Sequence, residues 1–228
     1  MADFQAQSDD FLNWFQSQPG STFHSSLSIT DLRSRNAGRG IIATEAIPAD
    51  TELFSIPRSS IISVADSRLS KLLPQIFTTL KDSEAADSDD IVIPDPWLDL
   101  VLVMMYEYLQ GDSSKWKPYF DVLPNVFDTL MFWSQSELDE LQASAVKDKI
   151  GKASADEMFS TKVLPVIKEH SAVFYPAEAM ELSDEDLMTV AHRMGSLVSF
   201  RDFYIIRVVL IRFTDHGIRI RHGVRRPR

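Results

Sequence analysis

Cysteine is absent from this chain of 228 residues, which excludes disulfide bonds and cysteine-based zinc sites. Long apolar runs are absent too, because the stretch at residues 98–105 is interrupted by Asp99 and is far shorter than a membrane span. Near the start, no basic region is followed by an apolar run, so no secretory signal is predicted. We therefore expect a protein of the nucleus or the cytoplasm, with no membrane partner.

Positive charge is scarce, since 23 Lys and Arg residues face 33 Asp and Glu residues and the net charge is −10. Such an acidic chain has no general affinity for nucleic acid, which is not an expected partner, whereas it would attract a basic protein substrate. Hydrophobic residues make up 44% of the sequence, with 14 Phe and 4 Trp, and this predicts a folded core. The length suits one large domain or a smaller domain that contains an insert.

The most informative motif is Gly38-Arg39-Gly40, which is followed by short apolar runs at residues 41–43 and 53–56. Glycine permits positive φ and has no side chain, so a ligand can meet the backbone directly at such a loop. The two apolar runs are partly β-branched and bounded by Gly and Pro, and they predict half-buried strands with a turn at residues 48–50 between them. From these residues alone, the loop is either a tight turn or a ligand-binding loop.

The order and spacing of Gly-x-Gly, an apolar strand, Ile47-Pro48, Leu53-Phe54 and Ile56-Pro57 resemble the opening of the SET domain of protein lysine methyltransferases. In that family the Gly-x-Gly loop holds S-adenosylmethionine, the methyl donor, largely through backbone atoms. The resemblance implies cofactor contacts at Ala37, Gly38, Arg39, Gly40 and Ser199. No residue is assigned as catalytic, and no metal site is expected.

Four further segments look like the branch of this family in which a helical insert interrupts the SET fold, as in the fungal ribosomal-protein lysine methyltransferases: residues 11–15, 97–100, 106–108 and 114–124. The resemblance implies an α+β, mostly helical fold, with N-terminal SET β-strands followed by a large α-helical insert. It also implies that the substrate is a basic ribosomal protein of the large subunit. The expected divisions are an N-terminal helix and the first SET strands at 1–63, the helical insert at 64–182, the start of the return to the SET core at 183–199, and an aberrant basic tail at 200–228.

Apolar spacing predicts helical elements at residues 8–18, 66–80, 96–109, 114–123, 134–150, 153–170 and 183–197. Pro165 is expected to bend or divide the sixth of them, and the acidic residues 81–90 are expected to form a mobile surface loop. Trp116 and Tyr119 are candidate substrate-binding residues or, alternatively, structural anchors. His192 is interpreted as a core or surface histidine rather than a metal ligand, because no second His or carboxylate stands at ligand spacing.

The segment at residues 200–228 differs from the rest of the chain. It contains eight arginines, no lysine and two acidic residues, and thus a charge of +6, against −16 for the first 199 residues. The Asn-His pair and the late tyrosine beside glycine on which SET chemistry depends do not occur, since no Asn follows Asn125 and the last tyrosine, Tyr204, is not directly followed by a glycine and lies too early. The resemblance therefore covers an N-terminal part with an incomplete SET fold. We expect this part to be truncated and inactive, or else to be a non-catalytic protein-binding fragment.

Three interpretations of this last segment stay open. It is a product of a retained intron or frameshift, a genuine end of a short isoform that binds substrate without methylating it, or a basic arm for nucleic acid. The apolar residues interleaved at 205–211 argue against a clean basic arm and are typical of an aggregation-prone segment.

Overall fold

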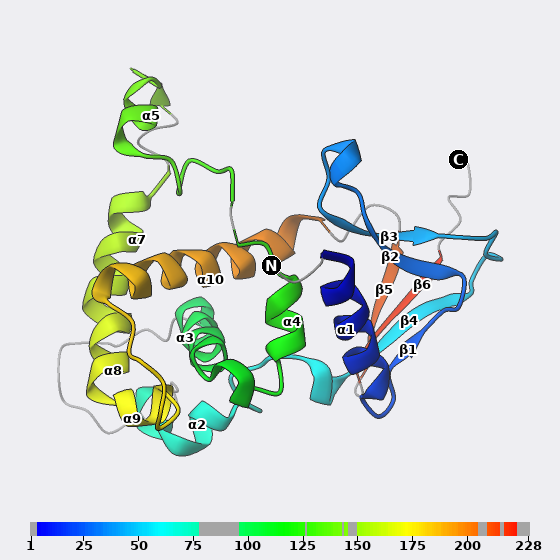
Figure 1. Cartoon of the computed structure of the whole chain (residues 1–228), viewed down its shortest axis with the longest axis horizontal. Helices are drawn as coiled ribbons and strands as arrows, with labels where there is room; N and C mark the ends of the chain where they lie inside the picture. The colour runs from blue at the N-terminus through cyan, green and yellow to red at the C-terminus, as the bar shows by residue number, and fades with distance from the viewer. Residues whose placement is uncertain are drawn as a thin grey trace. The chain divides into compact units, whose positions relative to one another are not determined.

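The computed structural model describes residues 4–77, 96–125, 127–142, 144–145, 150–204, 209–214 and 217–222. The chain divides into two compact units. Unit 1 combines Met1–Ile62, Lys115–Leu123 and Phe200–Arg228, and unit 2 combines Ser63–Ser114 and Pro124–Ser199. Unit 1 contains the strands, and unit 2 is built from helices (Figure 1). The α+β, mostly helical fold expected from the sequence is confirmed.

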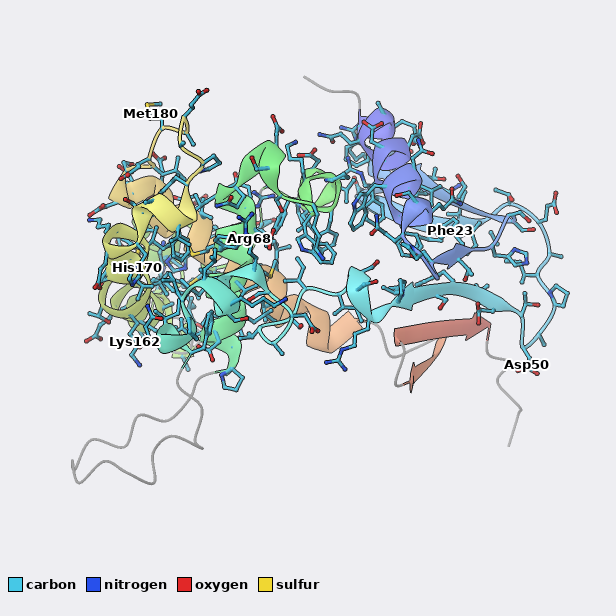
Figure 2. All side chains as sticks on the ribbon, turned by 90° about the horizontal axis from the view of Figure 1, so that it is seen from below. Phe23, Asp50, Arg68, Lys162, His170 and Met180 are labelled. Carbon is cyan, nitrogen blue, oxygen red and sulfur yellow. The ribbon has the colours of Figure 1, made fainter. Side chains whose placement is uncertain are left out.

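Two separate sheets form in unit 1. Strand β2 (Leu27–Asp31) pairs with β3 (Arg39–Ala43) in one antiparallel sheet, and β4 (Glu52–Pro57) pairs with the short β1 (Thr22–Phe23) in the other. Both predicted strands of the Gly-x-Gly region therefore form, although in different sheets. β4 is half-buried as expected, whereas residues 41–43 of β3 are exposed, so the expected burial is wrong there. The turn between them passes through Asp50, whose φ is +63° and which stands at the tip of this connection in Figure 2. The 3-10 turn η2 (Arg58–Ser60) follows β4.

The second sheet is completed from the other end of the chain. Its strand order is β1-β4-β6-β5, where β5 is Val209–Thr214 and β6 is Gly217–His222 (Figure 1). The register places Phe54 opposite Ile220 and Ile56 opposite Ile218, so apolar positions meet across β4 and β6. Two strands of the sheet thus come from the segment that the sequence sets apart as an aberrant basic tail.

Helices α1 (Phe4–Ser17) and α4 (Lys117–Val122) pack together in unit 1 through their aromatic faces. Phe11 lies against Tyr119, with ring centroids 6.3 Å apart, and Trp14 meets Trp116 at 5.6 Å. Such aromatic pairs contribute more than their buried area alone. The apolar stripe predicted for residues 8–18 is thus a packing face, and the helix begins four residues earlier than the stripe does.

Unit 2 is organised around α3 (Pro96–Leu109), whose residues Val101, Val103 and Met105 are completely buried. The other elements described in unit 2 are α2 (Arg68–Leu72), η3 (Pro74–Ile76), η5 (Gly111–Ser113), α5 (Gln135–Asp139), α7 (Lys152–Met158), the π-helical turn η6 (Phe159–Val163), α8 (Leu164–Glu169), α9 (Ser171–Phe174) and the greater part of the long helix α10 (Asp184–Tyr204). The C-terminal end of α3 is tied to α9, since Gln110 Nε2 donates to the carbonyl oxygens of Val173 and Phe174 at 3.0 and 2.8 Å.

Some predicted helices are shorter in the structure. The element predicted at residues 66–80 forms α2 and η3, because Pro74 opens a new turn after Leu72. The element predicted at 134–150 has the expected capping box at Ser134 but its helix ends at Asp139, and Gln142 has a φ of +46°. The acidic stretch 81–90 lies outside the described residues. No helix among the described residues combines the length and the apolar character that crossing a membrane requires.

Candidate cofactor loop

The Gly-x-Gly motif begins at the last residue of the loop that joins β2 to β3, which we call the β2–β3 loop (residues 32–38), and its other two residues open β3. Two backbone hydrogen bonds close it: the Leu32 N–H donates to the carbonyl oxygen of Gly38 at 2.9 Å, and the Ala37 N–H donates to that of Leu32 at 3.1 Å. The short helix η1 (Arg33–Arg35) and Asn36, with a φ of +55°, form the turn. The loop is therefore a closed backbone ring whose outer residues 33–38 are exposed.

The two glycines of the motif serve different purposes. A Cβ at Gly40 would stand 2.4 Å from Leu32 Cδ1, so any other residue there would force the Leu32 side chain to move. A Cβ at Gly38 would meet no atom within 4 Å. Neither glycine has positive φ. The residue with a left-handed backbone is Asn36, so the turn does not use the conformational freedom that the two glycines offer. Nothing inside the described part of unit 1 requires glycine at residue 38, which leaves its backbone open to a ligand.

Arg39 begins β3 and directs its guanidinium group into unit 1 rather than into solvent. Its nitrogens donate to Ser8 Oγ, Gln7 Oε1 and the carbonyl oxygens of Phe4 and Val122, at distances from 2.7 to 3.1 Å. Burial lowers the pKa of Arg39, and the nearby charge of Arg33 adds to this effect. The guanidinium nevertheless stays charged, because an arginine side chain is not deprotonated in proteins.

The base of the β2–β3 loop also contains an ion pair. Arg33 Nη2 lies 2.7 Å from Asp31 Oδ2, and hydrogen bonds from the Arg33 side chain and backbone lower the pKa of that carboxyl group. Asp31 is paired with Arg39 in the strand register, so two arginines and one carboxylate gather where the loop meets the sheet. Because the Asp31–Arg33 pair is largely exposed, it contributes little to stability.

The candidate substrate residues lie on α4 and just before it. Trp116 is 5% exposed, packs against Trp14, and has Lys115 Nζ 4.6 Å from its ring centroid. Tyr119 is half-buried between Phe11 and Phe120. These contacts are those of structural anchors, the alternative that the sequence leaves open, and a substrate contact at either residue stays a prediction.

The structure brings some of the predicted site residues together. Ala37, Gly38, Arg39 and Gly40 are consecutive in unit 1, and Arg39 reaches the end of the helix on which Tyr119 lies. Ser199 lies on α10, at the boundary of unit 2, and its side chain is outside the described residues. Its contribution to the cofactor site stays a prediction.

Sequence reasoning did not find the residues that hold Arg39, namely Phe4, Gln7 and Ser8. Ser8 is completely buried, and its hydroxyl donates to the carbonyl oxygen of Phe4 at 3.0 Å. The residues beside Ser8 in the sequence, Gln7 and Asp9, are polar, so nothing in the pattern indicated that Ser8 is buried against a guanidinium.

His192 is confirmed as a largely buried residue of α10 in unit 2, with a side chain that is 11% exposed. Its Nε2 is hydrogen-bonded to Asp156 Oδ1 at 2.5 Å, and its ring stands edge-on to Phe159. In the part of the chain that the structure describes, no group of three or more His, Cys, Asp or Glu side chains is arranged to hold a metal ion.

Two comparisons identify relatives of this sequence, whereas no family model matches it. The chain is similar to ribosomal lysine N-methyltransferase 4 of Saccharomyces cerevisiae, with 33% identity over 177 residues, which covers 76% of this chain and 34% of that protein. It is also similar to the N-lysine methyltransferase SETD6 of Mus musculus, with 30% identity over 146 residues, 62% of this chain and 28% of that protein. The chain thus spans about a third of the length of these curated relatives.

Solved structures share the fold. The SET domain of LSMT bound to lysine and AdoHcy matches with a TM-score of 0.60 and 19% identity, over 94% of this chain and 42% of that one. Rubisco LSMT bound to sinefungin and monomethyllysine matches with a TM-score of 0.58 and 21% identity, over 81% of this chain and 38% of that one. By its sequence relatives and its fold, the chain is a homologue of SET-domain protein lysine methyltransferases, among them a fungal ribosomal lysine methyltransferase.

Proposed function

We propose that this chain is the cofactor-loop part of an S-adenosylmethionine-dependent protein-lysine N-methyltransferase. The observation that carries the proposal is the exposed backbone at Gly38, where the loop is closed by its own hydrogen bonds and has no side chain on its open side. Two observations support the proposal. The relatives are lysine N-methyltransferases, and the structural neighbours bind AdoHcy or sinefungin.

The residues present fit a cofactor that is held through the backbone. The peptide groups around Ala37 and Gly38 are exposed, and the Arg39 charge is turned away from them by its contacts with α1. A cationic sulfonium would therefore meet backbone dipoles rather than a facing guanidinium. When bound, S-adenosylmethionine supplies an activated methyl group, and the protein's part is to orient it toward a neutral lysine amine.

The proposed substrate is a lysine of a basic ribosomal protein of the large subunit, in the nucleus or the cytoplasm. Its support is the name of the yeast relative together with the −16 charge of residues 1–199, which favours a basic partner. Nucleic acid is not part of the proposal. We also propose that the helices at residues 64–182 form the insert of the family and that residues 183–199 lead back toward the SET core.

Methyl transfer by the 228 residues alone is proposed to be lost. Transfer requires an in-line approach and groups that stabilise the moving charge, and one such polar contact is worth ~3 kcal/mol. The Asn-His pair and the late tyrosine beside glycine that serve the family do not occur in these residues. The second candidate function is therefore a non-catalytic fragment that binds the same protein partner, and the aromatic packing that holds α1 against α4 favours it.

The test combines binding and catalysis on the 228-residue chain. Isothermal titration with S-adenosylmethionine is expected to show saturable binding, and tritiated methyl transfer to purified large-subunit proteins is expected to give no signal above a no-enzyme control. Absence of cofactor binding would sink the proposal for the loop. Strong methyl transfer would instead show that the missing motifs are dispensable and would exclude the non-catalytic alternative.

A further inference from the structure

The guanidinium of Arg39 ends among acceptors from two helices that are far apart in the sequence. Nε donates to Ser8 Oγ at 2.9 Å, Nη2 donates to Gln7 Oε1 at 2.7 Å and to the Phe4 carbonyl oxygen at 3.1 Å, and Nη1 donates to the Val122 carbonyl oxygen at 2.9 Å. We call this group the Arg39 cluster. All of its members belong to unit 1.

One of the acceptors is a backbone group that its helix leaves available. The Val122 carbonyl is in the last turn of α4, where carbonyl groups have no partner within the helix and a cation interacts favourably with the helix dipole. At the other helix, the Arg39 guanidinium lies 3.8 Å from the ring centroid of Phe4. Arg39 therefore joins the start of α1 to the end of α4 through a single planar group.

A lysine could not replace this group. An ammonium is a point charge with three donors, whereas the guanidinium has five N–H groups in a fixed fork. The four contacts of Arg39 come from all three of its nitrogens, so they use the width of the fork. The contacts thus depend on the shape of the side chain and not only on its charge.

The position of Arg39 in the chain makes these contacts relevant to the β2–β3 loop. Arg39 follows Gly38 directly, and the Gly38 carbonyl accepts the hydrogen bond from Leu32 that closes the loop. With its side chain held by α1 and α4 and its backbone paired with Asp31, Arg39 has little freedom to move. The exposed backbone at Gly38 is consequently attached to a fixed point.

We propose that Arg39 is the positioning residue of the cofactor loop: its side chain locks the loop to α1 and α4, and does not touch the cofactor. The inference rests on the proposed function, because it assigns to Arg39 the task of pre-organising a backbone that binds S-adenosylmethionine. Pre-organisation raises affinity by removing the cost of ordering the loop when the ligand binds.

The test compares R39K with wild type and with R193K in the full 228-residue chain. Arg193 is a matched control, since it is also buried, donates to a backbone carbonyl oxygen, that of Pro124, and lies over an aromatic ring, but belongs to unit 2. Affinity for S-adenosylmethionine is measured by titration at a temperature at which each variant is folded. Amide hydrogen exchange is measured at Leu32 and Ala37, whose N–H groups close the loop.

For R39K we expect affinity to fall by about fivefold or more and exchange at Leu32 and Ala37 to rise by about tenfold. For R193K we expect a lower melting temperature with unchanged affinity and unchanged loop exchange. Q7A provides a milder variant if R39K does not fold, because it removes one acceptor from the Arg39 cluster, and it should shift both readouts in the same direction by a smaller factor.

An R39K affinity within about twofold of wild type would overturn the proposal, since the loop would then be ordered without the arginine. If the wild-type chain does not bind S-adenosylmethionine, the proposed function fails. The role of Arg39 in holding the loop is then tested by amide hydrogen exchange alone. Unchanged exchange at Leu32 and Ala37 in R39K would overturn that role.

Discussion

Gly38 and Gly40 have different surroundings. A substitution at Gly38 should therefore affect cofactor binding, and one at Gly40 should affect the stability of the fold. The space around Gly38 is open, whereas Leu32 occupies the position where a Gly40 side chain would stand. We expect Gly38→Val to weaken S-adenosylmethionine binding by about tenfold, because its side chain blocks the approach of a ligand to the backbone, without a change in stability. Titration and thermal unfolding measure the two effects.

Gly40→Val is the comparison for this prediction. Overpacking against Leu32 is expected to lower the free energy of unfolding by about 1–3 kcal/mol. Equal effects of the two substitutions on stability would contradict the assignment, and unchanged affinity in Gly38→Val would remove Gly38 from the cofactor site.

Tyr106 is expected to make unit 2 less stable at alkaline pH. Burial raises the pKa of Tyr106, the Glu107 charge adds to the effect, and Arg68 opposes it. The folded state therefore keeps the proton to a higher pH than the unfolded chain, whose tyrosines ionise at about pH 10. The unfolding free energy is expected to fall as the pH rises through and above that value.

Tyr106→Phe should reduce this pH dependence, because the variant has no phenol to ionise in the unfolded state. Urea unfolding between pH 8 and the alkaline limit of the assay, at about pH 10.5, measures it. Parallel stability curves for wild type and variant would show that Tyr106 does not contribute.

At the residue scale, the sequence identified the loop but not the part that each residue plays in it. The motif assigns the consecutive residues 37–40 to a cofactor site, and this assignment stays a prediction. The direction of the Arg39 side chain depends on Phe4, Gln7, Ser8 and Val122, which are local or distant neighbours that only tertiary packing brings to one point.

At the scale of elements, Pro165 divides a predicted helix as expected. It follows the π-helical turn η6, which separates α7 from α8. Proline has no N–H group to donate and its ring collides with the carbonyl four residues earlier, so the regular helical pattern is interrupted there. The interruption was predictable from one residue, whereas its π-helical form depends on the packing of η6.

Phe159, the first residue of η6, links two other helices of unit 2. Its side chain is 1% exposed and stacks on Trp97 of α3, with centroids 5.9 Å apart, while Gly195 of α10 leaves space for both rings. Phe159→Ala is expected to lower the free energy of unfolding by about 3–5 kcal/mol, because it leaves a cavity between the helices. Chemical denaturation measures the loss.

Leu72→Ala is the matched control for this prediction, since Leu72 is 47% exposed in the same unit and its removal leaves no closed cavity. Its effect should stay within about 1 kcal/mol. Similar losses for Phe159→Ala and Leu72→Ala would contradict the central place of Phe159.

The helices whose ends the sequence misplaced share a cause. Residues 66–80 and 134–150 contain apolar residues at helical spacing, but the structure interrupts both at local turns, at Pro74 and at Gln142. Apolar periodicity reports which residues face a core and says less about where a helix ends. The long buried helix α3, apolar on almost every side, was correctly predicted. Its apolar residues extend along its whole length, so they indicate both which residues are buried and where the helix ends.

At the scale of the whole molecule, the C-terminal strands belong to the sheet that also contains β1 and β4. Ending the chain at Tyr204 would remove β5 and β6 and leave one edge of β4 unpaired. An unpaired edge is a template for association with other chains. We expect this shortened form to self-associate and to melt at a lower temperature, as measured by light scattering after gel filtration and by thermal unfolding.

Removal of only residues 223–228 is the control, because it keeps both strands. A monomeric shortened form with an unchanged melting temperature would show that β5 and β6 do not stabilise unit 1. Composition alone could not predict the pairing. The excess of arginine in residues 200–228 suggested a segment apart from the fold, while the alternating apolar residues of Gly217–His222 match those of β4 only once the register is known.

The pairing of β4 with β6 delays completion of the sheet during synthesis. Pro57 of β4 is opposite Gly217 of β6, so β4 can pair with β6 only after 160 more residues have been made. At the ~5–20 residues per second of translation, this delay is about 8–32 s. During that time the residues of unit 2 emerge from the ribosome and are free to fold, while β4 stays exposed on one side. A nascent chain of this protein therefore keeps one edge of β4 unpaired until residue 217 has been made.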